Sequence, residues 1–464
     1  MEFFALLGIA TTVIVVLAAA LYRKRRDVGT LVGIAALYYW SLFGAWYIVI
    51  DKTGGFSGKN YGYLEGKLFS IGLDQNYLIA LGLYAGFIIL VELTLLLVVT
   101  PVTEDRTTEP LLLRHGPILL IGLAAGVASY LLVADKLGAA YTLNASAYIY
   151  TRSQTDEWFT LHQVLNRVAL LPPAIGLAVL AAGKRSRGLV SVNRRYTLLL
   201  YLALLGGMLT FAFILGNKNE VLSALVSGLL AYLGLVRKPN WIRAGLVLAA
   251  GLWMLYAIDF FRAVPLAGLE DAVGERTGSA TDVATFLTSS NEAYGSHFSM
   301  YGVLADGVEP KFGYSLYSLA CSVIPRVLWP DRPPDIYTYY SESVGAIQNQ
   351  GYSLHHATGW YLNFGYPGVA LGAIVMGLVW AYCLNAHRRT RSGHLFRLFA
   401  TVAPWLFVAC LPPLIRAGPE GYKGFLIEGV MIPVGVLAFA CRPKKIRAPL
   451  AWHPERGWIW RPAR

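Results

Sequence analysis

Long apolar stretches separated by short polar segments recur along nearly the whole chain. Each stretch is about 17 to 23 residues long, the length that a helix needs to cross the hydrocarbon of a bilayer. The pattern predicts about eleven membrane-spanning helices, at residues 3–22, 29–50, 77–99, 116–134, 164–183, 196–215, 221–236, 244–260, 364–386, 396–415 and 424–441. The expected fold is all-α: a polytopic helical membrane protein whose single domain comprises residues 1–464.

One long polar region interrupts this pattern. Residues 261–363, between the eighth and ninth predicted spans, are rich in Tyr, Trp, Arg and His. Such a region cannot lie in hydrocarbon, because its polar groups would be left without hydrogen-bond partners. We expect a large loop outside the membrane that is partly helical and carries the active site.

Composition supports the membrane assignment. Hydrophobic residues make up 56% of the chain and charged residues only 14%, and the mean hydropathy is +0.51. These values exceed those of a soluble globular domain. The first apolar stretch is too long for the apolar part of a signal peptide, and its basic cluster follows it rather than precedes it, so we expect a retained span.

The basic clusters predict the orientation. They lie at residues 23–26, 184–195, 237–238, 388–391 and 442–445, which all fall on one side if the spans alternate across the membrane. Because basic residues in short loops stay in the cytoplasm, we expect the N-terminus and the 261–363 loop outside and the C-terminus inside. The net charge of +12 is then explained by loops beside lipid headgroups, and it does not indicate nucleic-acid binding.

The sequence contains no Walker-type phosphate loop and no dinucleotide-binding motif. Its four cysteines show neither a disulfide pattern nor metal-ligand spacing. We therefore expect no cofactor and no bound metal, so the energy for any bond formation must come from an activated substrate.

Arginines in the predicted outer loop are candidates for phosphate binding. Arg276, Arg326 and Arg332 carry guanidinium groups, whose forked donors match phosphate oxygens. Arg326 and Arg332 lie in a proline-rich stretch, residues 324–334, that restricts the backbone. The alternative is that Arg332 pairs with a neighbouring aspartate or reaches lipid headgroups.

Aromatic and imidazole side chains follow in the same loop. Trp329, Tyr352 and Trp360 could stack on the apolar faces of sugars, although a belt of interfacial aromatics is the alternative. His355 and His356 are candidate general bases, because the imidazole pKa of about 6.5 lies near working pH. The alternative is that both histidines are solvated or cap a helix.

Four ionisable residues fall within predicted spans: Glu92, Arg167, Asp259 and Glu428. Charged groups at bilayer depth are costly unless they pair or line a cavity, and we expect structural pairing rather than substrate contact; Glu92 and Arg167 could pair in the inner half. Pro172 and Pro173 should break or kink the helix that carries Arg167.

The stretch Pro325-Arg326-x-x-Trp329-Pro330-x-Arg332-Pro333, the His355-His356 pair and the Asn363-Phe364-Gly365 turn together resemble bacterial O-antigen and oligosaccharide repeat-unit polymerases. The polar turn at 216–220 resembles one that these proteins carry at a similar place. More distantly, the chain is similar to O-antigen ligases, which share a large outer loop.

The resemblance implies transfer of a growing glycan from undecaprenyl pyrophosphate to the next lipid-linked repeat unit, at the outer face of the bacterial inner membrane. It also implies partners in that membrane, namely a chain-length regulator and a flippase. Two alternatives stay open: ligase-type transfer of the glycan to a terminal acceptor, and transport of a lipid-linked oligosaccharide without bond formation.

The resemblance also implies residue roles. Arg326 and Arg332 would bind the pyrophosphate and stabilise the leaving group, with Arg416 and Lys218 as further binding residues, and His356 or His355 would take the acceptor proton. Many family members have an acidic residue near the Asn-Phe-Gly turn, where this chain has Gly359-Trp360. That difference makes Glu342 or Asp335 an alternative base.

Overall fold

A computed structural model of the chain describes all residues except 53–72, 102–110, 139–140, 145–146, 149–150, 152–156, 184–188, 192–194, 237–240, 264–291, 323, 325–327, 330, 345–352, 387–393, 444–449, 454–456 and 461–464.

The described residues form a helical membrane protein, as the sequence predicts. Eight helices are long and apolar enough to cross a membrane. Six of the elements that supply them are α1 (Glu2–Arg25), α4 (Gln75–Val98), α5 (His115–Leu137), α7 (Glu157–Ala182), α8 (Arg195–Ile214) and α17 (Tyr366–Asn385). Two more are composite: α2 (Val28–Tyr38) continues through η1 (Tyr39–Phe43) into α3 (Gly44–Lys52), and α20 (Gly421–Lys423) continues through η7 (Gly424–Met431) into α21 (Ile432–Ala440).

The remaining three predicted spans are also helical, as α9 (Lys218–Leu235), α10 (Trp241–Ala263) and α18 (His394–Ala409). They do not meet the same criteria of length and hydropathy over described residues. The count of about eleven spans therefore stays a prediction.

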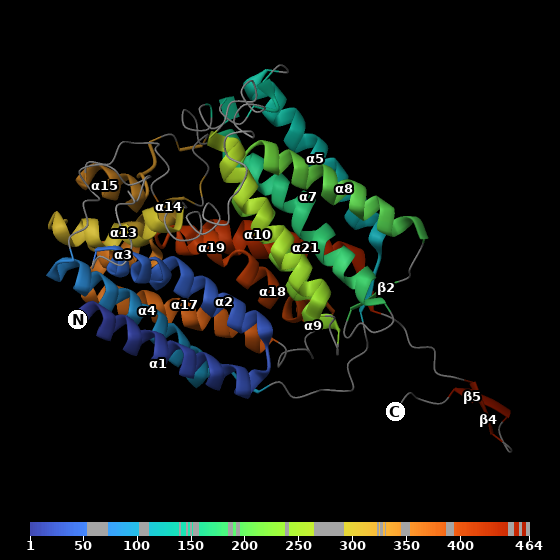
Figure 1. Cartoon of the computed structure of the whole chain (residues 1–464). Coiled ribbons are helices and arrows are strands. Elements are labelled where there is room, and N and C mark those ends of the chain that lie inside the picture. The colour runs from blue at the N-terminus through green and yellow to red at the C-terminus, as the bar shows by residue number, and fades with distance from the viewer. Residues whose placement is uncertain are drawn as a thin grey trace.

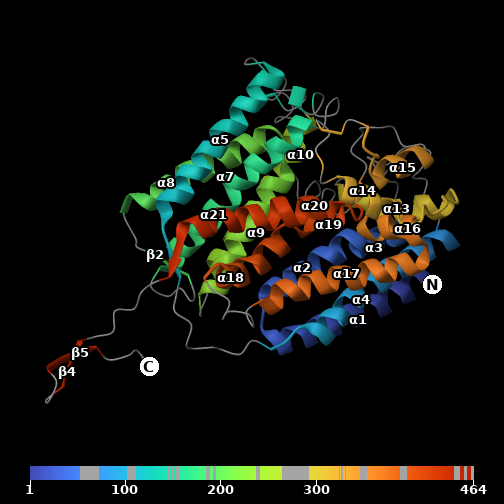
Figure 2. The same ribbon diagram turned by 180° about the vertical axis from the view of Figure 1, so that it is seen from behind.

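Short helices gather at one end of the bundle, where α1 begins (Figures 1 and 2). They are α13 (Glu292–Ala305), α14 (Tyr314–Cys321), α15 (Ile336–Ser343), α16 (His356–Phe364) and α19 (Leu411–Ile415). The first four come from the polar 261–363 region. The sequence predicts that this end faces outside, and it is called the outer end below.

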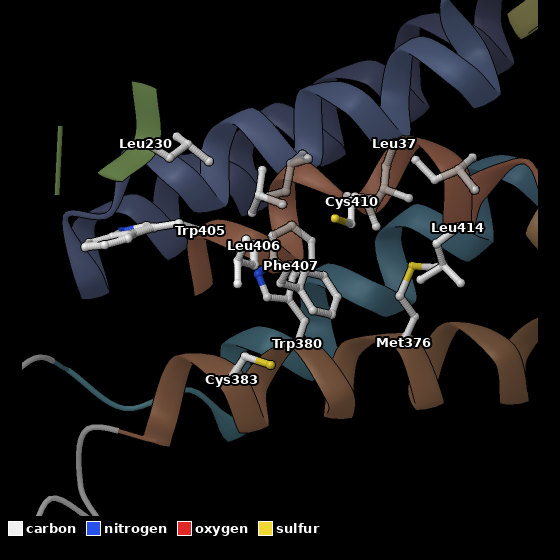
Figure 3. Packing of buried hydrophobic residues seen from close by; sticks show 14 of the residues in the cluster. Leu37, Leu230, Met376, Trp380, Cys383, Trp405, Leu406, Phe407, Cys410 and Leu414 are labelled. Carbon is white, nitrogen blue, oxygen red and sulfur yellow. The ribbon is translucent and has the colours of Figure 1, made fainter. Parts of the chain in front are cut away.

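The long helices form two groups that pack on either side of α18. One group contains α1, α2, α4 and α17, and the other contains α5, α7, α8, α9 and α21 (Figures 1 and 2). Figure 3 shows the core where α18 meets both groups, with Trp380 of α17 stacked on Phe407 of α18 at a centroid distance of 5.1 Å. Leu37 of α2 and Leu230 of α9 are buried in the same cluster.

A small three-stranded sheet lies at the opposite end. Its strands are β2 (Leu189–Ser191), β1 (Leu111–Leu113) and β3 (Cys441–Pro443), in that order, with β1 parallel to β2 and antiparallel to β3. A separate hairpin of β4 (Leu450–His453) and β5 (Gly457–Trp460) follows. The all-α prediction misses these strands, because three or four residues between helices carry too little alternation to be recognised. The pairing also brings together three loops that the predicted alternation of spans places on one side.

Among the described residues, two π-helical segments interrupt long helices: η1 lies midway along the composite helix of α2 and α3, and η7 follows the three residues of α20. In a π segment the backbone hydrogen bonds shift by one residue, and such segments are common at functional sites. The carbonyl of Ser41 in η1 accepts a hydrogen bond from His297 Nδ1 at 2.7 Å. The carbonyl of Gly424, the first residue of η7, accepts one from Arg167 at 3.1 Å. Both segments therefore hold side chains from other helices.

The helix that carries Pro172 and Pro173 is not broken. Both prolines lie inside α7, which is continuous from Glu157 to Ala182. Ala169 and Leu170, on the preceding turn, are buried against neighbouring helices. A proline has no N–H to donate to the carbonyl one turn earlier. Packing against neighbouring helices can keep the helix continuous despite this missing hydrogen bond.

Candidate active site

The segment 411–424 links α18 to η7 and packs against several elements at the outer end. Its helix α19 contacts α2, α16 and η7. It approaches α16 closely at Gly359 and Gly418, where a Cβ on Gly359 would lie 2.6 Å from the Gly418 Cα atom. The absence of side chains at these two positions allows the helix and the segment to touch.

Two cationic side chains from distant parts of the chain meet beside this segment. Arg332 donates to the carbonyl oxygen of Ser322 at 3.2 Å, and Lys423 donates to the same oxygen at 2.6 Å. Arg332 also donates to the Ile324 carbonyl at 3.1 Å. These contacts are to backbone carbonyls rather than to the neighbouring aspartates, so the positive charges of the two side chains are not neutralised by them.

Arg416 joins the segment to the polar turn 216–220. Its guanidinium lies 3.5 Å from Asn219 Oδ1 and 5.4 Å from the centre of the Trp40 ring. Lys218 is the first residue of α9, next to Asn219. The structure thus places Arg416 against the turn that carries Lys218, although the two predicted binding residues are far apart in the sequence.

The 216–220 turn is anchored by a buried polar network. Gly216 has φ 75°, which favours glycine, and lets the chain reverse between α8 and α9. Asn217 lies 3.4 Å from His162 Nε2, which also lies 2.9 Å from the Asn166 amide. Ser129 completes the network, 3.0 Å from His162 Nδ1. Ser129, His162 and Asn166 were not predicted, because the network depends on how α5 and α7 pack against the turn.

Glu420 is a carboxylate that the sequence analysis missed. Its Oε1 accepts a hydrogen bond from the Ile336 backbone N–H at 3.0 Å. Its Oε2 is buried and has no hydrogen-bond partner among the described residues. Burial raises the pKa of Glu420 to about 8. The sequence could have indicated Glu420 as a candidate site residue, because it is the one acidic residue between Arg416 and Lys423 in a predicted outer loop.

His356, the favoured candidate base, has both ring nitrogens occupied. Its Nδ1 lies 2.8 Å from the Ala417 carbonyl oxygen, which can only accept, so Nδ1 carries the proton. Its Nε2 then accepts from the indole N–H of Trp360 at 3.0 Å. The residue is fully buried. In this arrangement its lone pair is not available to an acceptor hydroxyl.

His355 is held in the same way. It is the N-cap of α16, and its Nδ1 accepts from the Ala357 backbone N–H at 3.1 Å. Its Nε2 therefore carries the proton and donates to Ser41 Oγ at 3.0 Å. This contact corresponds to the helix-capping alternative considered from the sequence.

His297 of α13 was not predicted and completes the group. Its Nδ1 donates to the Ser41 carbonyl, and its Nε2 lies 2.9 Å from the Tyr77 hydroxyl. Burial lowers the pKa of His297 and of His356 to about 4. Burial also lowers the pKa of His355 well below its usual value, with a smaller effect from the two other histidines. All three rings are thus neutral at physiological pH.

The predicted aromatic residues have different surroundings. Trp360 is buried and packs on α17, where a Cβ on Gly372 would lie 2.4 Å from its ring. Its position is that of a core residue rather than of a sugar-stacking platform. Trp329 is partly exposed. Arg276, Arg326 and Tyr352 lie outside the described residues.

The two alternative bases also have defined positions. Asp335 is the N-cap of α15, where its Oδ1 accepts from the Thr338 backbone N–H and from the Thr338 hydroxyl, both at 3.1 Å. A carboxylate in this role is committed to the helix terminus. Glu342 lies exposed on the same helix.

The expected pair of Glu92 and Arg167 is wrong. Arg167 pairs with Glu428, with 2.7 Å between nitrogen and oxygen, in a largely buried position. Glu92 is fully buried in α4, and neither of its oxygens has a hydrogen-bond partner among the described residues. The reason is helix packing, since α4 packs against α1 and α17 whereas α7 packs against α5, α9 and α21. The side chain of Asp259 is not described.

Among the described residues, no three His, Cys, Asp or Glu side chains are grouped so that they could hold a metal ion. All four cysteines are free and buried. The chain was also compared with family models, with curated proteins and with solved structures, and nothing matches it in any of the three.

Proposed function

We propose that this protein is a bacterial inner-membrane glycosyltransferase that polymerises lipid-linked oligosaccharide repeat units. The observation that carries the proposal is the meeting of Arg332 and Lys423 on one carbonyl oxygen, beside a segment that also holds Arg416 and Glu420. Together with the resemblance in residues 325–333 and 355–365, this arrangement suits a polyprenyl pyrophosphate donor better than a neutral substrate.

In the proposed reaction, the bond between the anomeric carbon of the donor glycan and the pyrophosphate oxygen breaks. A hydroxyl oxygen of the acceptor repeat unit forms the new glycosidic bond and loses its proton. Arg332 and Lys423 stabilise the negative charge that develops on the departing undecaprenyl pyrophosphate. Arg416 and Lys218 bind further phosphate or glycan oxygens, and Arg326 is adjacent in the sequence to this site.

Glu420 is the favoured proton acceptor. Its Oε2 atom has no described partner, and its pKa of about 8 lies near working pH, where a general base is most effective. His356 is the alternative base. It could act only after it released the indole N–H of Trp360.

The test is reconstituted transfer. Purified protein in nanodiscs receives undecaprenyl pyrophosphate-linked repeat units, and the products are separated by length. A ladder of lengthening lipid-linked glycan supports polymerisation. Attachment of finished glycan to a terminal acceptor, with no ladder, would favour the ligase reaction instead. Movement of substrate across the bilayer without a new bond would favour transport.

A further inference from the structure

An apolar groove lies between α7, α8 and α9, within the part of the protein that crosses the membrane. It has a volume of about 450 Å³. Its walls include Ala174 and Ala178 of α7, Leu202 and Gly206 of α8, and Ala224 and Gly228 of α9. The other lining residues are Leu, Ala and a single Tyr. Nothing in this lining would favour a polar ligand.

The groove is open toward the lipid. Leu202 on its α8 wall is 52% exposed. A Cβ on Gly206 would meet no atom within 4 Å. Along α9, the lining residues run from Ala224 to Tyr232, a length of about 12 Å at the rise of an α-helix. A narrow apolar channel of this length, open along one side, fits a hydrocarbon chain.

Charged residues lie above the outer end of the groove on the faces that line it. On α9, Glu220 lies one turn before Ala224, and on α7, Arg167 lies two turns before Ala174. Arg167 pairs with Glu428, and Arg167 also donates to the carbonyl of Gly424, the residue that follows Lys423, at 3.1 Å. The groove therefore leads toward the cations of the candidate active site.

We propose that this groove binds the polyisoprenoid chain of the lipid-linked substrate, with the phosphate end directed toward Lys423 and Arg332. The assignment rests on the proposed function for the identity of the lipid. The cationic side chains above the groove complement the phosphate of a polyprenyl phosphate, and the apolar groove of small residues complements its hydrocarbon chain.

The test uses a polyprenyl phosphate that carries a photoreactive diazirine in its chain, added to the full-length protein in nanodiscs. Crosslinks are mapped by mass spectrometry. They should fall on residues 174–181, 202–209 and 224–232, and unlabelled undecaprenyl phosphate should compete with them. Crosslinks elsewhere only, or equal competition by phosphatidylglycerol, would overturn the proposal.

A matched pair of variants sharpens the test. Gly206→Phe fills the groove, whereas Gly207→Phe adds the same ring at the next position of α8, which does not line the groove and is also open. Crosslinking should fall about tenfold in Gly206→Phe, equivalent to about 1.4 kcal/mol of binding. It should remain near the wild-type level in Gly207→Phe. An equal effect of both substitutions would overturn the groove assignment.

The two proposals fail separately. If glycan transfer is observed but the groove is not labelled, the groove assignment is wrong and the proposed function stands. If the groove is labelled and no new glycosidic bond is ever made, the lipid site stands and the polymerase proposal is wrong.

Discussion

The indole N–H of Trp360 donates a hydrogen bond to Nε2 of His356 over 3.0 Å. Because the other ring nitrogen donates to the Ala417 carbonyl, the imidazole is held in one tautomer between α16 and the 411–424 segment. The residue that the sequence favours as a base thus acts in this structure as a connection between two elements.

Trp360→Phe should lower the free energy of unfolding by about 1 to 3 kcal/mol, since it leaves a buried acceptor without its donor. The loss of ring volume adds to this cost. Chemical unfolding in detergent, followed by far-UV circular dichroism, measures the change. Trp329→Phe is the control, because Trp329 is partly exposed. Equal effects of the two substitutions would contradict the proposed connection.

The three buried histidines predict a loss of stability in acid. The pKa values of His297 and His356 are lowered to about 4 in the folded protein, whereas the unfolded chain takes up these protons near pH 6.5. The unfolded state therefore binds more protons between about pH 6.5 and pH 4, and stability falls as the pH falls through this window.

Melting temperatures measured from pH 7 to pH 5 test this prediction. Glu420 acts in the opposite direction, since its raised pKa favours the folded state below pH 8. His297→Gln should show a shallower decline than the wild type. An unchanged slope in the variant would show that His297 is not buried and neutral in the folded protein.

Glu420→Gln should abolish most of the transfer activity, by about 100-fold or more, if Glu420 accepts the proton. In the wild type, kcat/KM should rise with pH up to about 8, because the carboxylate form increases over this range. The remaining activity of the variant should lack this rise. Glu342→Gln, at an exposed position of α15, should retain both the rate and the pH profile. A pH profile that survives in Glu420→Gln would return the role to His356.

Substitution by leucine should lower the free energy of unfolding more at Glu428 than at Glu92. Glu428→Leu leaves the Arg167 guanidinium buried without its partner, and we expect a loss of about 3 to 5 kcal/mol. Glu92→Leu removes a carboxyl with no described hydrogen bond, so stability should be unchanged or higher. Chemical unfolding of both variants measures the difference. A larger cost at Glu92 would mean that this carboxyl has a partner such as water.

The helices could be predicted because an apolar stretch long enough to cross the hydrocarbon of a bilayer indicates a membrane-spanning helix. Arg332 could be chosen because cations are few in the predicted outer loop, and Arg416 and Lys218 because of the family resemblance. The Arg167–Glu428 pair could not be predicted, because hydropathy does not show which helices become neighbours. His297 was missed for a related reason: its properties come from burial, which depends on segments distant in the sequence. The position of Glu420 between Arg416 and Lys423 was a signal, but its raised pKa also comes from burial. The buried position of Trp360 follows from close contact with α17 at Gly372, which composition does not reveal.

In the proposed reaction, Arg332 and Lys423 form one anion site for the donor pyrophosphate. The most direct measurement is the initial rate of lipid-linked glycan polymerisation by the purified protein and by Arg332→Ala and Lys423→Ala. Each substitution should lower the rate by about 100-fold or more, since each removes a charge that stabilises the leaving group. Lys136→Ala, which removes an exposed cation at the end of α5, should leave the rate unchanged. Wild-type rates in Arg332→Ala and Lys423→Ala would show that these two side chains do not bind the donor pyrophosphate.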